Sequence, residues 1–172
     1  MALLPIVIAP DQRLRVKCAP VVTVDGDLRR LADTMLETMH AAPGIGLAAP
    51  QVSDTRRLIV VDVARAEEKP NPLRLANPEI VWRSPETRLA EEGCLSLPDQ
   101  YAEVERAAAV KVRYMDMDGA VQEIGAEGLL AACLQHEIDH LDGILFVDHL
   151  TALRRGMIMR RMKKLKRQGE VA

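Results

Sequence analysis

Two histidines and a glutamate in the last third of the chain have the spacing of a metal site. His136, Glu137 and His140 form an H-E-x-x-H pattern. In a helix, residues four positions apart lie one turn apart on the same face, so both imidazoles can bind one cation. Glu137 lies beside the first histidine, where its carboxylate can reach a water molecule at the cation without being a ligand. The pattern therefore predicts a divalent metal ion with an acid–base group next to it.

The helix that carries this pattern is predicted to be buried. Several leucines widen the apolar surface around one helical stripe, which consists of Leu129, Cys133, His136 and His140. Buried histidines and carboxylates need partners, because an unpaired polar group in the interior is costly. A metal ion supplies such partners. From their place on the stripe, Leu129 and Cys133 are expected to line an apolar pocket beside the metal.

The spacing alone leaves the third protein ligand open. Catalytic metal sites usually have three protein ligands and one water molecule, and the pattern provides two. Asp148 and His149 are candidates downstream, as in zinc endopeptidases with this motif. Cys94 is a candidate upstream, in a turn-like segment between Gly93 and Pro98. A lone cysteine is more often an inert buried thiol, as expected for Cys18.

A glycine-containing segment near the middle of the chain is suited to close contact with a bound peptide. Gly44 and Gly46 stand among small apolar residues, where they permit a close backbone approach. Ile45 and Gly46 are expected to pair with an extended substrate backbone. Gln51 adds an amide that can donate to an oxygen atom. A plain connection between a helix and a strand explains the segment equally well.

Taken together, the three segments resemble a known enzyme family. GIGLAAPQV, EGCLSLP and QHEIDHLDG occur in this order, and they closely resemble the three signature motifs of peptide deformylases. The similarity extends over nearly the whole chain. The family removes the formyl group from the initiator methionine of nascent bacterial and organellar proteins, so the resemblance implies the same substrate here, an N-formylmethionyl peptide.

The resemblance also implies roles for individual residues. It makes Cys94, His136 and His140 the metal ligands and Glu137 the general acid and base. It implies Fe(II) as the native metal, with zinc, nickel or cobalt able to occupy the site. The backbone N–H of Leu95 and the amide of Gln51 are implied donors to the oxyanion. Tyr101 departs from the pattern, because many similar members have an arginine there that contacts the substrate.

Three helices are expected to frame the site. Leucines and methionines at helical spacing predict a helix over residues 27–40, begun by Asp25 or Asp27 and ended at Pro43 and Gly44. The H-E-x-x-H helix is predicted over residues 129–141. A third helix is predicted over residues 151–166, with an apolar stripe formed by Leu150, Leu153, Met157, Ile158, Met162 and Leu165.

Strand patterns and helices together indicate an α+β fold. Strands are expected at residues 58–63, 79–82, 87–91 and 101–104, and at 110–115 and 121–124, the last two joined by a turn at Asp118 and Gly119. Because strands do not alternate one-for-one with helices, we expect mostly antiparallel sheets around the central buried helix, with an N-terminal and a C-terminal helix. We also expect Glu92 and Arg106 to pair and steady the cysteine loop. The 172 residues are expected to form one domain, 1–172.

The charge is distributed unevenly along the chain. The net charge is −2, but residues 150–172 contain eight Lys and Arg residues and one acidic residue. A solvent-exposed helix face explains such a run. Deformylases of bacteria are similar in docking on the ribosome near the exit tunnel through a C-terminal helix, so this basic helix is a candidate ribosome contact. With an aromatic content of 2%, the chain has no platform for stacking bases, and specific DNA binding is not expected.

Composition further limits the class of protein. The hydrophobic content of 48% is ordinary for a globular chain and excludes a disordered polymer. No stretch is long and apolar enough to span a membrane, and no signal peptide is expected. Three cysteines suit reduced thiols in the cytoplasm of a bacterium, with an organellar origin left open.

Two other functions are compatible with the residues themselves. A zinc endopeptidase of the H-E-x-x-H type would cleave internal peptide bonds and would use a third ligand other than Cys94. A deformylase-like binding protein would keep the metal without turnover. The intact Glu137 argues against this second alternative.

Overall fold

The computed structural model describes residues 2–169 of the chain. Met1 and residues 170–172 lie outside the described part, so the predicted domain 1–172 and the basic segment 150–172 both extend beyond it. Within residues 2–169, no helix is long and apolar enough to cross a membrane.

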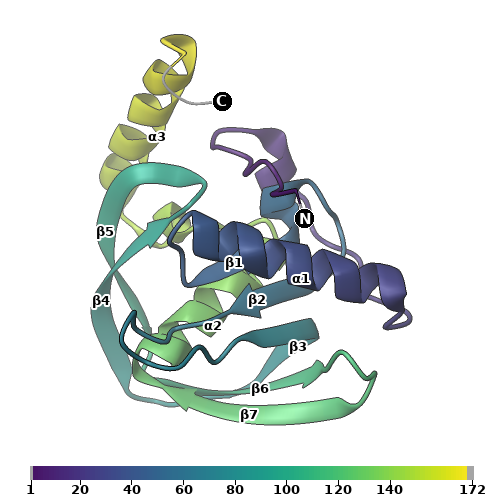
Figure 1. Ribbon diagram of the computed structural model, residues 1–172. Helices are drawn as coiled ribbons and strands as arrows, with labels where there is room; N and C mark the ends of the chain where they lie inside the picture. The colour runs from purple at the N-terminus through teal and green to yellow at the C-terminus, as the bar shows by residue number, and fades with distance from the viewer. Residues whose placement is uncertain (1, 170–172) are drawn as a thin grey trace.

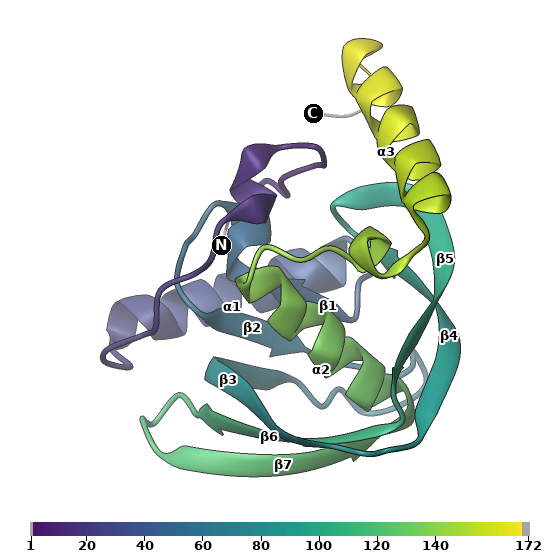
Figure 2. The same cartoon turned by 180° about the vertical axis from the view of Figure 1, so that it is seen from behind.

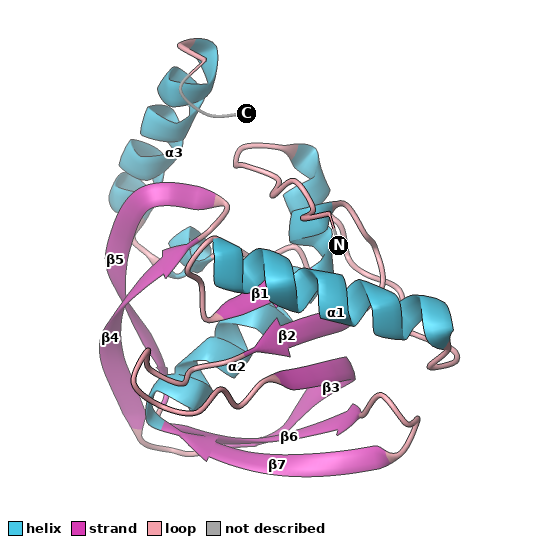
Figure 3. Cartoon of the chain, in the orientation of Figure 1, coloured by secondary structure: helices cyan, strands magenta, loops and turns pink. Residues whose placement is uncertain are grey.

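Two antiparallel sheets form the β part of the fold (Figures 1 and 3). The larger sheet has the order β1-β2-β3-β6-β7, and β4 pairs with β5 in the smaller one. The strands of the larger sheet are β1 (Gly46–Ala48), β2 (Leu58–Val61), β3 (Leu73–Arg83), β6 (Ala109–Met115) and β7 (Val121–Glu127). The smaller sheet consists of β4 (Thr87–Cys94) and β5 (Leu97–Ala107). The mostly antiparallel α+β fold predicted from the sequence is confirmed.

Three α-helices accompany the sheets: α1 (Gly26–Ala41), α2 (Gly128–Leu141) and α3 (Ala152–Arg167). Three short 3-10 helices are η1 (Gln12–Arg15), η2 (Ala49–Val52) and η3 (Phe146–His149). The predicted helices agree with these bounds to within one residue at each end. Asp25 is the N-cap of α1, because its side chain accepts a hydrogen bond from the N–H of Leu28.

Strand β2 lies between two helices, which explains its continuous apolar sequence. Ile59 and Val61 pack with α2, whereas Leu58 and Val60 pack with α1. The two helices lie on opposite faces of the β1–β2 part of the sheet, as comparison of Figure 1 with the reverse view in Figure 2 shows. A strand covered on both faces must be apolar at every position. Helix α2 is thereby buried at the centre of the fold, as predicted.

Several strand boundaries differ from the sequence prediction. The strand expected at 58–63 ends at Val61, and that expected at 79–82 is part of the longer β3. The strands expected at 87–91 and 101–104 both extend further, because the long β4–β5 ribbon continues past the short apolar runs. The sequence pattern predicts no strand at residues 46–48 and leaves open whether this segment only connects a helix to a strand. The segment is β1, which forms the edge of the larger sheet beside β2.

Helix α3 extends beyond the body of the molecule (Figures 1 and 2). Met162 is buried, and Ile158 and Leu165 pack against the same cluster. The predicted apolar stripe is wrong at two positions, since Leu153 is 71% exposed and Met157 is 57% exposed. At 3.6 residues per turn, Leu153 and Met157 lie on a different face of the helix from Ile158, Met162 and Leu165, and that face points away from the core cluster.

The α1 cap gives a direct stability test. Replacing Asp25 by alanine removes the acceptor for the Leu28 N–H, and the free energy of unfolding should fall by about 1 kcal/mol. Asp27→Ala is the matched control, because Asp27 is an exposed residue whose contacts are ion pairs with Arg56 and Arg30. Its effect should be clearly smaller. Urea unfolding of both variants measures the difference, and equal losses would contradict the assignment of the cap.

Candidate metal centre

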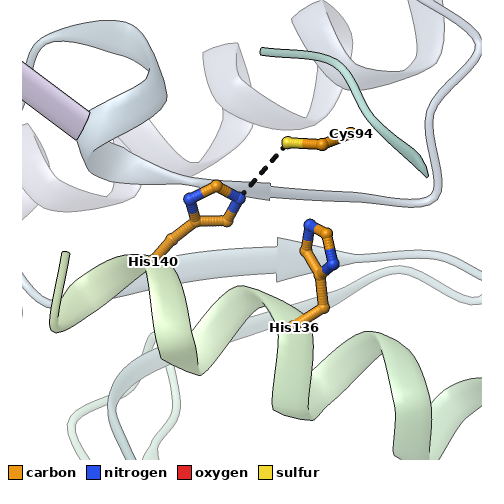
Figure 4. Close-up of side chains that lie close together, drawn as sticks. All are labelled: Cys94, His136 and His140. Carbon is orange, nitrogen blue, oxygen red and sulfur yellow. Dashed lines mark hydrogen bonds between the residues drawn. The ribbon is translucent and has the colours of Figure 1, made fainter. Parts of the chain in front are cut away.

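Three side chains from two elements converge on one point (Figure 4). Cys94 lies at the end of β4, while His136 and His140 lie one turn apart on α2. One ligand atom from each of the three residues lies within 4.8 Å of the other two. Cys94 Sγ is 3.4 Å from Nε2 of His140. The structure thus brings together Cys94 and the two histidines of the sequence motif.

The β4–β5 ribbon places the cysteine. The regular pairing of the two strands ends with a shift between Gly93 and Cys94, and Cys94 then pairs with Leu97. Leu97 is buried in a cluster that also contains Phe146 of η3. The Phe146 ring stacks on the His136 ring with centroids 6.1 Å apart. The tip of the ribbon is therefore packed against the same region of the core that holds the first histidine.

Glu92 orients His136 from the other side of the ring. Nδ1 of His136 lies 2.8 Å from Oε1 of Glu92. Burial raises the pKa of Glu92, but its hydrogen bonds with His136 and Arg106 outweigh this effect and the pKa is lowered. An ionised Glu92 accepts a hydrogen bond from the protonated Nδ1 of His136. This leaves Nε2 of His136 as the nitrogen that can bind a cation.

The predicted pair between Glu92 and Arg106 is confirmed, and the structure extends it. Arg106 Nε donates to Glu92 Oε2 at 2.6 Å, and Arg106 Nη1 donates to Oδ2 of Asp139 at 3.0 Å. The same Asp139 oxygen lies 2.8 Å from Nε2 of His149. This Glu92–Arg106–Asp139 network connects β4, β5 and α2 beside the side chains of Cys94, His136 and His140.

The donor set suits a divalent transition metal. Cys94 provides sulfur and the histidines provide imidazole nitrogens, ligands that iron, zinc, nickel and cobalt all accept. Burial lowers the pKa of His140 well below its usual value, which favours the neutral imidazole that binds a metal. Among buried side-chain atoms in residues 2–169, Glu137 Oε1 and His140 Nδ1 have no hydrogen-bond partner. The buried polar cluster therefore fits a bound cation.

Glu137 is buried beside the two histidines without joining the cluster. Its Oε2 lies 3.9 Å from Nε2 of His136, too far for a hydrogen bond. Burial, reinforced by the nearby carboxylates of Glu92 and Asp139, raises the pKa of Glu137 to about 7 against the opposing charges of His136 and Arg106. A carboxyl group with this pKa can both accept and release a proton near neutral pH.

Gln51 approaches the cluster from η2. Its Nε2 lies 3.5 Å from Cys94 Sγ and donates to Ser96 Oγ at 3.0 Å. Its Oε1 accepts from the N–H of Ala48 at 2.9 Å, which fixes the amide orientation. Leu95 directly follows Cys94, and it lines the same cavity as Gln51. Ser96 was not singled out by the sequence; its place two residues after Cys94 was the available signal.

A cavity of about 580 Å³ opens onto these residues. Its lining includes His136 and Glu137 together with the residues proposed from the sequence to contact a substrate, namely Ile45, Gly46, Leu129 and Cys133. A methyl group on Gly46 would lie 2.5 Å from Glu137 Oε2 and 2.8 Å from Cys133 Sγ. Only glycine permits this close approach of β1 to α2.

Tyr101 also lines the cavity. It pairs with Gly93 across the β4–β5 ribbon, and a methyl group on Gly93 would lie 2.6 Å from Tyr101 Cε1. The aromatic ring therefore occupies the space beside Gly93 in the cavity wall.

The two downstream candidates for a third ligand lie elsewhere. Asp148 pairs with Arg15 at 2.5 Å, and His149 contacts Asp139. Neither belongs to the cluster found among the described residues. The structure leaves Cys94 as the partner of the two histidines.

Comparisons with known proteins agree closely with one another. A family model described as polypeptide deformylase matches residues 3–156. A peptide deformylase of Rhizobium meliloti is 55% identical over 164 residues, covering 95% of this chain and 94% of the relative. One from Mesorhizobium japonicum is 53% identical, covering 96% and 94%. The crystal structure of peptide deformylase from Ehrlichia chaffeensis has a TM-score of 0.93 at 38% identity, covering 99% of this chain and 100% of that one.

Removal of Arg106 should loosen the metal. Arg106→Ala deletes the donors that hold Glu92 in place, so His136 loses a fixed orientation and metal affinity should fall about 10–100-fold. Metal content after dialysis against a chelator measures this. Arg113→Ala, which breaks a long surface pair with Glu123, is the control and should retain its metal. Unchanged metal content in Arg106→Ala would refute the orienting role.

Proposed function

This chain belongs to the polypeptide deformylase family, and we propose that the cluster of Cys94, His136 and His140 is its catalytic metal site. The chain is a hydrolase that removes the formyl group from N-terminal formylmethionine of newly made proteins and releases formate. The observation that carries the assignment of the site is the convergence of one thiol and two imidazoles at a cavity that Glu137 also faces.

We propose one divalent cation held by Cys94 Sγ and one nitrogen of each histidine, with Fe(II) as the native metal. Zinc, nickel and cobalt fit the same ligands. A cation there supplies Lewis acidity, lowering the pKa of water at the site and polarising a carbonyl oxygen. The alternative of an endopeptidase with a downstream third ligand lacks support, since Asp148 and His149 are engaged elsewhere.

Glu137 acts as the general base and then as the general acid. Its unpaired Oε1 takes a proton from the water molecule that attacks the formyl carbon. The same carboxyl group then gives the proton to the nitrogen of the departing amine, which leaves as a free N-terminus while formate is released. Burial, which raises the pKa of Glu137 to about 7, supports both roles at neutral pH.

Gln51 and Leu95 stabilise the charge that develops on the formyl oxygen. The Gln51 amide is already fixed by Ala48 and Ser96, so it is preorganised to donate. The backbone N–H of Leu95 adds a second donor beside the ligand sulfur. Removing one donor of this kind typically costs about 3–4 kcal/mol of transition-state stabilisation.

The substrate lies as an extended chain along β1. Gly46 provides free backbone groups at this sheet edge, where a peptide can add as a further strand, and Ile45 lines the cavity beside it. Leu129 and Cys133 line the cavity on the α2 side and hold the methionine side chain. Tyr101 stands where many similar proteins have an arginine. It therefore makes a different contact with the substrate residues that follow the methionine.

We further propose one domain over residues 1–172, working in the cytoplasm. The family match over residues 3–156 and the packing of Ala107 of the smaller sheet against the core cluster of the larger sheet support a single domain. The free state of Cys18, Cys94 and Cys133 supports a reducing compartment.

The basic C-terminal helix is proposed to dock on the ribosome near the exit tunnel. Pro10 and four cations of α3, Arg160, Lys163, Lys166 and Arg167, surround a shallow hollow. Clustered cations of this kind attract RNA phosphates in a salt-dependent way. The exposed Leu153 and Met157 add apolar surface on the same helix.

Formate release tests the catalytic assignment. Protein purified without oxygen should release formate from a formyl-Met-Ala-Ser peptide. Glu137→Ala should keep its metal and lose about 10²–10⁴-fold in rate, because the proton carrier is gone. Cys94→Ala should lose the metal as well. Metal-loaded wild-type protein that releases no formate would support the alternative of a binding protein without turnover, and cleavage of internal bonds would support the endopeptidase.

Ribosome docking has a separate test that leaves the core intact. Replacing Arg160, Lys163, Lys166 and Arg167 by glutamine preserves Met162, which is buried. Ribosome pelleting should show weaker binding with a salt dependence shallower by about 3 units of log–log slope, and unchanged activity on short peptides. Equal ribosome binding by this variant and the wild type would rule out the docking role.

A further inference from the structure

Asp62 contacts both ends of the segment that faces the cavity. Residues 42–45 join α1 to β1, and Pro43, Gly44 and Ile45 line the cavity. At one end of the segment, Nε2 of His40 lies 3.1 Å from Asp62 Oδ2. At the other end, the N–H of Asp62 donates to the carbonyl of Ile45 at 2.8 Å. One residue directly after β2 therefore spans this segment.

The carboxylate of Asp62 is a well-anchored group. Its side chain is 4% exposed. Its Oδ1 accepts from the N–H groups of Ala64 and Asn71 at 3.1 and 3.3 Å. Charge-assisted bonds to fixed backbone donors restrict a buried carboxylate to one position. Asp62 thus links the end of α1, the loop after β2 and the edge strand β1.

The position of β1 matters for the chemistry. In an antiparallel ladder, the polar groups of successive residues point alternately toward and away from the neighbouring strand. Because the carbonyl of Ile45 bonds to the β2 side, the N–H and carbonyl of Gly46 point to the free edge. Gly46 also packs directly against Glu137 and Cys133. A small displacement of Gly46 would therefore move a bound peptide relative to Glu137.

We propose that Asp62, with His40 as its partner, is a positioning residue. It holds strand β1 where the free backbone groups of Gly46 can pair with the peptide backbone of the substrate. This inference rests on the proposed function, because it assigns the backbone groups of Gly46 to substrate binding. Asp62 acts through Ile45 and Gly46 and does not itself touch the reacting atoms. The effect of Asp62 on KM should grow with the length of the peptide that pairs along the edge of β1.

The test compares Asp62→Ala with a matched loop variant. Asp116 accepts two backbone N–H bonds, from Asp118 and Ala120, and one side-chain bond from Gln122, in the turn between β6 and β7. It thus has the same number of bonds as the Asp62 carboxylate but lies away from the residues that line the cavity. Asp116→Ala therefore shows how the loss of loop hydrogen bonds away from the cavity affects KM.

For Asp62→Ala, KM for formyl-Met-Ala-Ser should rise about tenfold with kcat within about threefold, the pattern of lost uniform binding. KM for formylmethionine itself should change by less than about threefold. Asp62→Asn, which keeps an acceptor oxygen for the loop, should recover most of the wild-type KM. Asp116→Ala should leave KM unchanged.

If Asp62→Ala does not fold, His40→Ala removes only the link to α1 at a half-exposed side chain and should raise the tripeptide KM about threefold. A tripeptide KM equal to that of the wild type in the folded Asp62 or His40 variants would overturn the positioning role, as would an equal rise in Asp116→Ala. A wild-type enzyme without formate release would instead refute the proposed function.

Discussion

The structure depends on one constraint: helix α2 is buried and yet carries two imidazoles and a carboxylate. Most of the other buried residues of the helix are apolar, and it packs against β2 through Ile59 and Val61, while the buried Gln135 bonds to the backbone of Ala107 and Ala131. His136, Glu137 and His140 must therefore find their partners inside the fold. The thiol that β4 brings beside them, and the cation that we propose for this cluster, would meet this requirement for the histidines. Glu137 Oε1, which has no hydrogen-bond partner among residues 2–169, lies at the cavity where we propose that the substrate binds.

The small β4–β5 sheet is held to the helix by charge as well as by apolar packing. Glu92 on β4, Arg106 on β5 and Asp139 on α2 form a continuous chain of hydrogen bonds. Burial raises the pKa of Glu92, but its hydrogen bonds with His136 and Arg106 outweigh burial and the pKa is lowered. The network lets the ribbon deliver Cys94 while it orients His136. Structural attachment and metal binding thus share the same residues.

Sequence reasoning predicts local features well and long-range placement poorly. The bounds of α2 follow from its periodicity and from Gly143, which adopts a positive φ of 75° just past the end of the helix. Spacing could not choose Cys94 over Asp148, because Cys94 and His140 are 46 positions apart and only the fold joins them. The edge strand β1 is three residues long and wholly buried, so it has no alternating pattern. The predicted apolar stripe of α3 is wrong at Leu153 and Met157, because only the face with Ile158, Met162 and Leu165 packs on the core.

The central claim is that one thiol and two imidazoles hold one cation in the interior of this fold. Absorption spectroscopy of the protein reconstituted with Co(II) tests it most directly, because a sulfur ligand adds an intense near-ultraviolet charge-transfer band. One equivalent of Co(II) should bind per chain. The charge-transfer band should disappear in Cys94→Ser and persist in Cys133→Ser. A band that survives in Cys94→Ser, or wild-type protein that binds Co(II) without such a band, would contradict the account.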